Sequence, residues 1–285
     1  MLSDYPRHML NKNELFHVKS KYGVINYFIN DYWFTRNGSD KIFEEDLILK
    51  YLKKTVKGSR LVLDIGAHAG SHTIVYKALN PDIMVLAFEP QERMFELLKY
   101  NIESQSLTNV TLFNFAIGHM AGSTTLDTKI HDPGEEISLS YDPNVISNLG
   151  GVGFGPGGEI VSIITIDSLN LERLDYIKID VQGAENLVIL GGRDTITRFK
   201  PVIFFESDHS ALSTNTLMSL GIEHSLPDTM AILREIGYSQ FLQLDNNNYL
   251  ASFYRDFRAS TILLRALAFK RKLDLRRRVR VFFGY

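Results

Sequence analysis

Five runs of mostly apolar residues recur between residues 60 and 207, and each is too short to form a typical helix. They are rich in Val, Ile, Leu and Phe, as in LVLDIG and VIFFES. Near-continuous apolar runs of this length are typical of parallel strands that are buried on both faces of a sheet. We therefore expect strands within the segments 60–66, 84–90, 109–118, 175–183 and 200–207.

The segments between these runs carry the 3.6-residue period of amphipathic helices. The alternation of strands and helices predicts an α/β fold with an open, doubly wound and mostly parallel sheet. Near the end, GYSQFLQLDNNNYLASFY predicts a hairpin across an Asn-rich turn, which would add antiparallel strands at one edge. The predicted helices lie at 71–79, 92–104, 184–192 and 193–199.

Both ends of the chain fall outside this alternation. Residues 1–57 form an N-terminal appendage with an aromatic, strand-like run at 27–35 and a helical period at 41–56. Residues 255–285 form a tail with a net charge of +8, which leaves −10 on the rest of the chain. The tail could bind an anionic membrane surface, contact the phosphates of a nucleic acid, or pack on the acidic body or on a second subunit. The domain between them spans 58–254.

The composition narrows the class of protein. The chain has no cysteine, which excludes disulfides, thiolate metal sites and a cysteine nucleophile. Its beginning lacks the apolar core of a signal peptide, and no apolar stretch approaches the ~20 residues of a membrane span. We therefore expect a cytoplasmic enzyme or binding protein.

A glycine-containing turn follows the first predicted strand. Asp64, Gly66 and Gly70 stand where an open α/β sheet binds its ligand, at the carboxyl end of a strand. His68 occupies the position that holds the second glycine of the G-x-G-x-x-G dinucleotide fingerprint, and a side chain there would push a diphosphate away. A nucleoside ligand without phosphates, such as S-adenosylmethionine, fits this turn better.

The next two strand ends support the same ligand. Glu89 ends the second predicted strand, at the position of an acid that accepts hydrogen bonds from ribose hydroxyls. The third predicted strand ends at NFAIG, where Asn114 and Phe115 are placed to flank an adenine ring. Three such features in the correct order predict a nucleoside site more strongly than any one of them.

These segments together resemble the FkbM family of S-adenosylmethionine-dependent methyltransferases. The resemblance covers LDIGAHAGSHT, AFEPQERMFELLKYNIE, NVTLFNFAIGHMAG, TIDSLNLERLDYIKIDVQGAENLVILGG and PVIFFE. It implies a Rossmann-like class I fold and methylation of a hydroxyl oxygen, often on a sugar. It also implies a reaction centre near Asp180. The implied cofactor contacts are Asp64, Gly66, His68, Gly70, Glu89, Asn114, Phe115 and Ala116.

Transfer of a methyl group to a hydroxyl requires a general base, a metal ion that acidifies the hydroxyl, or both. Asp180 and Glu206 end consecutive strands, so we expect one catalytic pair, which could bind Mg²⁺ or a similar divalent cation. His209 is a further candidate base.

Each of these residues also has a structural interpretation. Asp180 could cap the following helix, Glu206 could bind nearby backbone, and His209 could be an exposed loop residue. Lys178 shares a strand face with Asp180, where it could orient an acceptor, although a structural salt bridge is the favoured role. Gln182 stands where many FkbM proteins have glutamate, and an amide is a poor base.

The glycine-rich segment 150–158 is either a flexible connection or a flap over the acceptor. A sugar of a glycan or glycolipid is the expected acceptor, on the resemblance alone. An RNA ribose methyltransferase and a non-catalytic cofactor-binding protein are the alternatives, although no aromatic and basic RNA-binding module is found. A homo-oligomer is left open.

Overall fold

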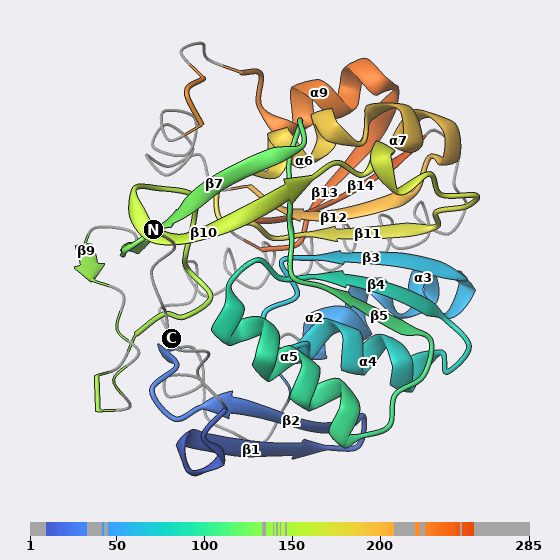
Figure 1. Cartoon of the computed structure of the whole chain (residues 1–285). Helices are drawn as coiled ribbons and strands as arrows, with labels where there is room; N and C mark the ends of the chain where they lie inside the picture. The colour runs from blue at the N-terminus through green and yellow to red at the C-terminus, as the bar shows by residue number, and fades with distance from the viewer. Residues whose placement is uncertain are drawn as a thin grey trace, which may run out of the picture.

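The computed structural model describes residues 10–32, 42, 45–132, 135–138, 140, 142, 144–145, 147–207, 220–222, 226–245 and 247–253. Its centre is a seven-stranded sheet with the order β13-β14-β12-β11-β3-β4-β5 (Figure 1). The strands are β3 (Leu61–Ile65), β4 (Met84–Phe88), β5 (Val110–Phe113), β11 (Tyr176–Ile179), β12 (Val202–Glu206), β13 (Tyr238–Gln243) and β14 (Asn248–Phe253).

The strand order reverses beside β3, which creates a topological switch point. From β3 the chain adds β4 and β5 on one side, whereas β11 and β12 lie on the other side, all in parallel. All five residues of β3 are buried, which explains its uninterrupted apolar run. In such sheets the ligand binds at the carboxyl ends of the strands next to this point.

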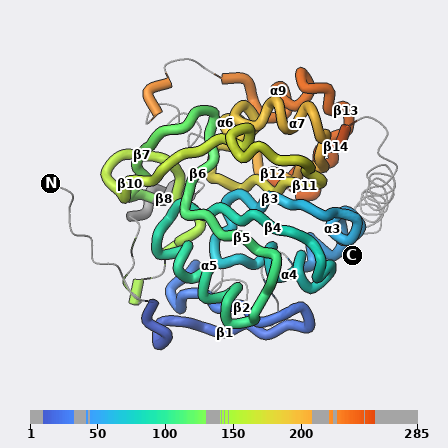
Figure 2. The backbone as a smooth tube through the Cα atoms, turned by 45° about the vertical axis from the view of Figure 1, so that its right-hand side comes forward, coloured from blue at the N-terminus to red at the C-terminus, as the bar shows by residue number. Residues whose placement is uncertain are grey.

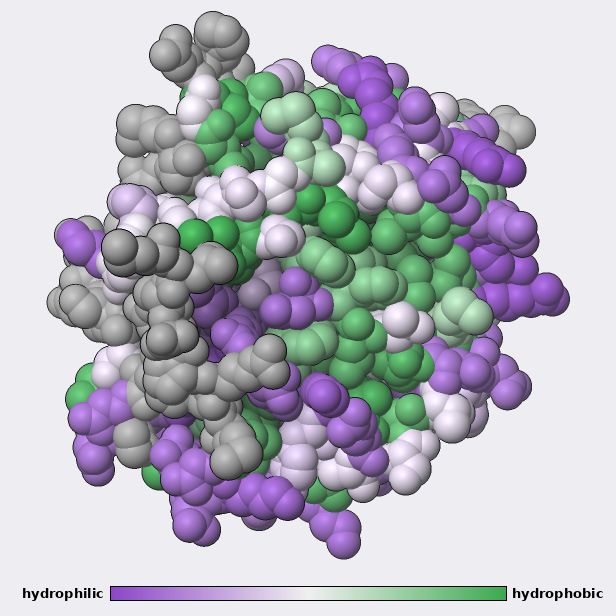
Figure 3. Space-filling view, in the orientation of Figure 1, coloured by the Kyte–Doolittle hydropathy of each residue, from purple (hydrophilic) through white to green (hydrophobic). Residues whose placement is uncertain are grey.

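Helices cover both faces of the sheet (Figures 1 and 2). On one face lie a helical run, α2 (Glu45–Leu47), η2 (Ile48–Leu52) and α3 (Lys53–Gly58), together with α4 (Ser71–Leu79) and α5 (Glu92–Ser104). On the other face lie α6 (Glu185–Gly191), α7 (Arg193–Phe199) and α9 (Thr229–Ile236). Each layer packs on its own hydrophobic core. Figure 3 shows apolar residues gathered over the middle of the molecule, among hydrophilic ones.

Three smaller sheets were not predicted. The hairpin of β1 (Leu15–Ser20) and β2 (Gly23–Phe28) packs on α4 and α5, outside the central sheet (Figure 2). A second sheet has the order β6-β10-β7, and a third pairs β8 with β9. Their strands are β6 (Ala116–Ile117), β7 (Gly122–Asp127), β8 (Lys129–Asp132), β9 (Glu135–Ser138) and β10 (Gly157–Ile164). Short 3-10 turns lie at η1 (Lys12–Glu14) and η3 (Asp167–Leu169).

The predicted fold class is confirmed, and the boundaries differ in two places. The run 109–118 is divided into β5 and β6 at Asn114 and Phe115. The aromatic run 27–35 is not one strand, because β2 ends at Phe28 and residues 33–41 lie outside the described part. The hairpin β13–β14 pairs antiparallel with β12, as expected.

The division into an appendage, a domain and a tail stays a prediction. The tail, 255–285, lies outside the described residues. Within the described ranges, no helix is both long and apolar enough to cross a membrane.

Candidate cofactor and catalytic site

The loop after β3 is pressed between two neighbouring strand ends. The backbone N–H groups of Gly66 and Ala67 donate to the carbonyl oxygen of Phe88, at 3.0 and 2.9 Å. Gly66 has φ +74°, and a Cβ on it would lie 1.8 Å from the carbonyl oxygen of Asp180. Only glycine fits this position, since a side chain would displace the end of β11. The loop is therefore built into the edge where the ligand is expected.

Gly70 supplies the second conformational requirement of the loop. It has φ +90° and immediately precedes α4, and a Cβ on it would lie 2.8 Å from Leu98 Cδ1. The left-handed backbone turns the chain directly into the helix. The predicted strand–turn–helix unit is thus confirmed.

Asp64 lies beneath the loop and is fully buried. Its Oδ2 accepts a hydrogen bond from Thr73 Oγ1 at 2.6 Å, and its Oδ1 lies 3.8 Å from Lys178 Nζ. These contacts tie β3 to α4 and β11. The structure gives Asp64 a role in supporting the loop, and its predicted direct contact with the cofactor stays a prediction.

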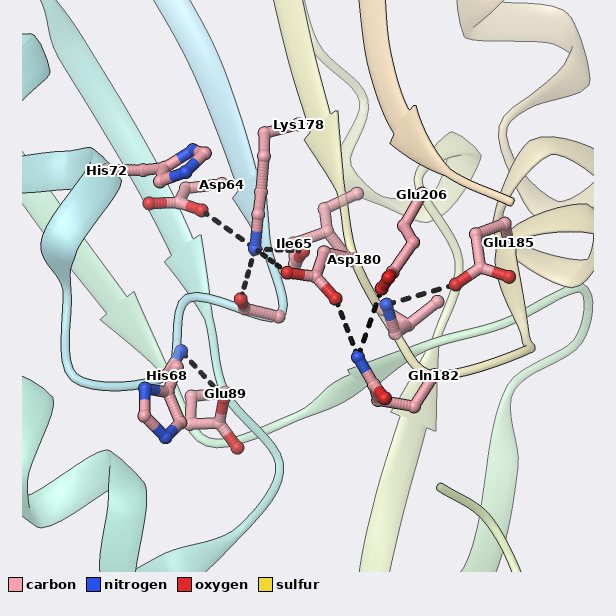
Figure 4. Close-up of polar contacts among 12 residues, drawn as sticks. Asp64, Ile65, His68, His72, Glu89, Lys178, Asp180, Gln182, Glu185 and Glu206 are labelled. Atoms are coloured by element: carbon pink, nitrogen blue, oxygen red, sulfur yellow. Dashed lines mark hydrogen bonds and ion pairs between the residues drawn. The ribbon is translucent and has the colours of Figure 1, made fainter. Parts of the chain in front are cut away.

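Lys178 is the buried centre of the polar contacts drawn in Figure 4. Its ammonium donates to the carbonyl oxygens of Ile65 and Gly66 and lies 3.4 Å from Asp180 Oδ2. The structural salt bridge predicted for Lys178 is found, with Asp64 and Asp180 as its partners. The same ammonium also binds the glycine loop through these two carbonyl oxygens. The period-2 spacing of Lys178 and Asp180 did not indicate this second contact.

Glu89 follows β4 and is almost fully buried. Its Oε2 accepts the backbone N–H of His68 and its Oε1 that of Gln91, each at 2.9 Å. A carboxylate oxygen can accept more than one hydrogen bond, so both oxygens keep capacity for ribose hydroxyls. Burial raises the pKa of the Glu89 carboxyl, although the charge of His68 and these two hydrogen bonds oppose the rise.

His68 adopts a left-handed backbone conformation, with φ +50°. Its Nε2 lies 3.4 Å from Asp31 Oδ2, and the His68 side chain is 25% exposed, whereas that of Asp31 is 2% exposed. Burial lowers the pKa of His68, but the hydrogen bond and charge of Asp31, together with the charges of Glu89 and Asp180, outweigh this effect, so the pKa lies above its ordinary value of 6.5. The segment before the sheet therefore reaches the glycine loop.

The segment after β5 is fastened to the end of β4. The amide of Asn114 donates to the carbonyl oxygens of Glu89 and Pro90, at 2.9 and 3.0 Å. Phe115 is half-buried, and Ala116 is buried in β6. Asn114 thereby positions the segment that carries Glu89, and the predicted adenine contacts of residues 114–116 stay predictions.

Asp180 and Glu206 are brought together by Gln182 (Figure 4). Gln182 Nε2 donates to Asp180 Oδ1 at 2.9 Å and to Glu206 Oε2 at 3.2 Å. The interpretation of Asp180 as a helix cap is wrong, because α6 begins at Glu185, after Ala184, without a side-chain cap. The expected pairing of the two acids is found, with an amide between them.

The charges around Asp180 keep it ionised. Burial raises its pKa, but the ammonium of Lys178, the hydrogen bonds shared with Glu206 and Gln182, and the charge of His72 together bring the pKa below 3.8. The side chain of Asp180 is 32% exposed. It is thus a charged acceptor that an incoming group can reach.

The predicted metal site does not fit the donor set that the structure describes. No group of three or more His, Cys, Asp or Glu residues that could hold a metal is found among the described residues. The N–H donor of Gln182 lies between the two acids, and the ammonium of Lys178 adjoins Asp180. The donated hydrogen bonds of this neutral amide and the charge of the ammonium relieve the repulsion that a cation was expected to relieve. His209 lies outside the described residues.

The glycine-rich segment 150–158 packs closely on β7, so it is not a loose connection. Gly155 donates to the Thr125 carbonyl oxygen at 3.0 Å, and a Cβ on Gly158 would lie 2.4 Å from that of Leu126. A Cβ on Gly150 would lie 3.3 Å from the ring of His68. The segment therefore borders the glycine loop, and its role as an acceptor flap stays a prediction.

Two acids near the site were missed in the sequence. Asp31 follows Asn30 in the middle of the aromatic run 27–35, and this polar pair was the signal that one strand does not span the run. Glu159 accepts the N–H of Glu92 at the start of α5 at 2.8 Å, and burial raises its pKa to about 7. Nothing in the sequence around Glu159 indicates this, because β10 lies in a sheet with no predictable partner strands.

Glu185 supports the loop that carries Gln182. It is buried, and its Oε1 accepts the N–H groups of Val181 and Gly183, each at 3.2 Å. Burial raises the pKa of the Glu185 carboxyl from 4.5 to about 7, and the charge of Asp180 adds to the rise. Folding therefore favours the protonated form of this acid.

This shift predicts how stability depends on pH. The stabilising contribution of Glu185 is fully present below pH 4.5 and is lost as the pH rises through about 7. We expect the free energy of unfolding of the wild type to fall by about 1–3 kcal/mol more than that of Glu185→Gln over this range. Urea unfolding at a series of pH values measures the difference. Parallel pH profiles of the two proteins would contradict the assignment.

Comparison with known proteins identifies the family. Residues 64–239 match the Methyltransferase FkbM domain. The 2-O-methyltransferase NoeI of Sinorhizobium fredii (strain NBRC 101917 / NGR234) is 30% identical over 164 residues, which cover 53% of this chain and 65% of that protein. The chain thus spans slightly less than two thirds of that relative's length. This doubly wound protein, with a glycine loop at its switch point, belongs to the FkbM methyltransferase family.

Two solved structures resemble the fold loosely. The FkbM methyltransferase of Methylobacillus flagellatus KT is 18% identical, with a TM-score of 0.45 over 68% of this chain and 44% of that one. The precorrin-6y C5,15-methyltransferase of Geobacter metallireducens GS-15 is 14% identical, with a TM-score of 0.42 over 76% of this chain and 92% of that one. The family assignment rests on the sequence match.

Proposed function

We propose that this protein transfers the methyl group of S-adenosylmethionine to a hydroxyl oxygen of a sugar. The observation that carries the proposal is the joined pair of sites at one sheet edge: the glycine loop with Glu89, and Asp180 beside it. Membership of the FkbM family supports methyl transfer. The name of the NoeI relative supports a 2-hydroxyl acceptor.

The residues of the loop fit a nucleoside without a diphosphate. Gly66 and Gly70 keep the backbone free of side chains, whereas His68 occupies the place where a dinucleotide site needs glycine. Both oxygens of Glu89 are oriented by backbone N–H groups and can accept the ribose hydroxyls. When bound, the cofactor supplies an electrophilic methyl group on a sulfonium.

Asp180 is the group that receives the acceptor hydroxyl. Its carboxylate is charged, partly exposed and held by Lys178 and Gln182, so it can accept the hydroxyl hydrogen bond and take the proton. A carboxylate of low pKa is a weak base, so it acts while the oxygen becomes acidic during transfer. Glu206, bound to the same amide, positions Asp180 from the other side. The rest of the rate acceleration comes from holding the acceptor hydroxyl in a fixed orientation toward the methyl group.

The role of Glu89 predicts a loss of cofactor affinity on substitution. Glu89→Ala should weaken binding of S-adenosylhomocysteine by about 1–3 kcal/mol, because the ribose hydroxyls lose a buried acceptor. Glu92→Ala is the matched control, since it removes an exposed acid of the same charge three residues away. Calorimetric titration compares them. Equal affinities of the two variants would remove Glu89 from the site.

The acceptor is tested by a transfer assay with methyl-labelled S-adenosylmethionine. Oligosaccharides, glycolipids and RNA are offered in parallel, and label is expected in a saccharide. If only the RNA is labelled, the acceptor is a ribose of RNA and not a saccharide. Cofactor binding without transfer to any acceptor would favour a non-catalytic protein of the same fold.

A further inference from the structure

The side chain of Gln182 lies between the two acids at the carboxyl ends of β11 and β12 (Figure 4). Its Nε2 lies 2.9 Å from Asp180 Oδ1 and 3.2 Å from Glu206 Oε2. An amide nitrogen carries two N–H donors, so each carboxylate can receive its own hydrogen bond. The two partners also fix which end of the amide points inward, because its carbonyl oxygen would repel both carboxylates. One neutral side chain therefore holds both acids.

The backbone that carries Gln182 is fastened on both sides. Gln182 has φ +54° and Gly183 has φ +97°, so the chain turns through the left-handed region here. A residue with a side chain is uncommon in this conformation. The buried Glu185 accepts the N–H groups of Val181 and Gly183 at its Oε1, each at 3.2 Å. These two bonds flank Gln182 and hold the turn that directs its amide at the acids.

The amide occupies the place that a cation would take between the acids. A divalent cation lies about 2.0–2.6 Å from its carboxylate oxygens, and the amide nitrogen lies a little farther from the oxygens of Asp180 and Glu206. The ammonium of Lys178 lies 3.4 Å from Asp180 Oδ2. A cation beside Asp180 would therefore also be repelled by this ammonium. The N–H donors and the ammonium together allow two carboxylates to stay close.

We propose that Gln182 is a positioning residue of the methyl transfer and that its amide stands in place of a metal ion. This inference rests on the proposed function, since it concerns how the acceptor hydroxyl meets Asp180. The amide donates to one oxygen of Asp180, and Lys178 lies beside the other, so the orientation of the carboxylate is fixed. The Asp180 side chain is 32% exposed, which leaves it open to the hydroxyl. Glu185 acts through Gln182, by holding its turn.

Metal binding tests the proposal without an acceptor. Gln182→Glu keeps the length of the side chain but replaces its N–H donors by a third carboxylate, and three carboxylates form a donor set for a hard divalent cation. Calorimetric titration with calcium chloride or magnesium chloride should show saturable one-to-one binding by this variant, about 10-fold tighter than the wild type or more. Adding Asp180→Asn should abolish the gain. Gln243→Glu makes the same chemical change at an exposed position of β13 and is the matched control.

The side-chain amide of Gln182 supplies a spectroscopic readout that a merely structural role would not change. Its NMR signals are identified by their loss in Gln182→Met. We expect these signals to shift in Asp180→Asn and in Glu206→Gln, because each substitution replaces a charged acceptor by a neutral one. Glu172→Gln, at an exposed acid, should leave them unchanged.

The effect on turnover separates positioning from folding. Gln182→Met has a similar size but no donor, and it should lower kcat about 10- to 100-fold on the acceptor found in the transfer assay, because Asp180 loses its fixed orientation. KM for S-adenosylmethionine should stay within about twofold, since the glycine loop and Glu89 are intact. Glu185→Met should act in the same direction. Glu185→Gln, which retains an acceptor oxygen for both backbone N–H groups, should restore most of the activity.

Three results would overturn the inference. Binding of calcium or magnesium by the wild type that is lost in Asp180→Asn would show that the pair holds a cation despite the amide. Amide signals that respond to neither acid substitution would remove the hydrogen bonds, and unchanged kcat in Gln182→Met would remove the positioning role. If Gln182→Glu does not fold, the amide signals and Gln182→Met still decide.

Failure of the proposed function gives a different result. A wild type that does not bind S-adenosylhomocysteine would overturn the proposed function. The metal titrations and the amide signals need neither cofactor nor acceptor, so they would still report whether the amide of Gln182 stands in place of a cation.

Discussion

Asp180→Asn is expected to lower turnover about 10²- to 10⁴-fold, the usual contribution of a positioned general base. The amide cannot take the hydroxyl proton, although it keeps the size of the side chain. Binding of S-adenosylhomocysteine should stay within a few fold of the wild type. Glu206→Gln should act in the same direction, and the double variant should be little worse than Asp180→Asn, because residues that act as a unit are non-additive.

Steady-state methyl transfer and calorimetry together measure these effects. Glu172→Gln is the matched control, since Glu172 is an exposed acid in the connection that precedes β11. The low pKa of Asp180 adds a second expectation: its protonation should not limit the wild-type rate between about pH 5 and 8. Full turnover in Asp180→Asn would contradict the catalytic assignment.

Lys178→Met is expected to destabilise the fold by about 3–5 kcal/mol. The ammonium is buried, and its removal leaves the fully buried Asp64 without its nearest positive group. The substitution also removes the hydrogen bonds from the ammonium to the carbonyl oxygens of Ile65 and Gly66, and these bonds hold the glycine loop. Methionine has a similar length and fills most of the space, so packing changes little.

Equilibrium urea unfolding measures the loss, and a double variant tests its cause. Lys178→Met combined with Asp64→Asn should recover part of the stability, because the uncompensated carboxylate is then absent. Lys178→Met that unfolds within about 1 kcal/mol of the wild type would show that this buried pair contributes little.

The sequence predicted those parts of the fold that depend on local pattern. The apolar runs of β3 and β11 are buried throughout and those of β4 and β12 are mostly buried, and such burial leaves a direct trace in residue type. The glycines at 66 and 70 were found for the same reason, since their backbone conformation restricts the residue allowed. The small sheet β6-β10-β7 left no such trace, because its strands are mostly half-exposed and pair across long separations.

The site was predicted in part. The residues placed by strand order were predicted, whereas those placed by side-chain contacts were not. Strand order brings Asp180 and Glu206 together, and that follows from the topology. The topology does not show which side chain lies between the two acids. Gln182 was set aside as a poor base, but its N–H group donates to both carboxylates. Asp31 was not predicted, because a contact between residues 31 and 68 depends on how the hairpin β1–β2 packs.

The central claim is that the loop from Gly66 to Gly70, with Glu89, binds the nucleoside of S-adenosylmethionine. Calorimetric titration of the wild type with S-adenosylhomocysteine and, separately, with NAD tests this claim most directly. We expect saturable one-to-one binding of S-adenosylhomocysteine and none of NAD, because His68 occupies the space that a diphosphate needs. Binding of NAD without binding of S-adenosylhomocysteine would contradict the account.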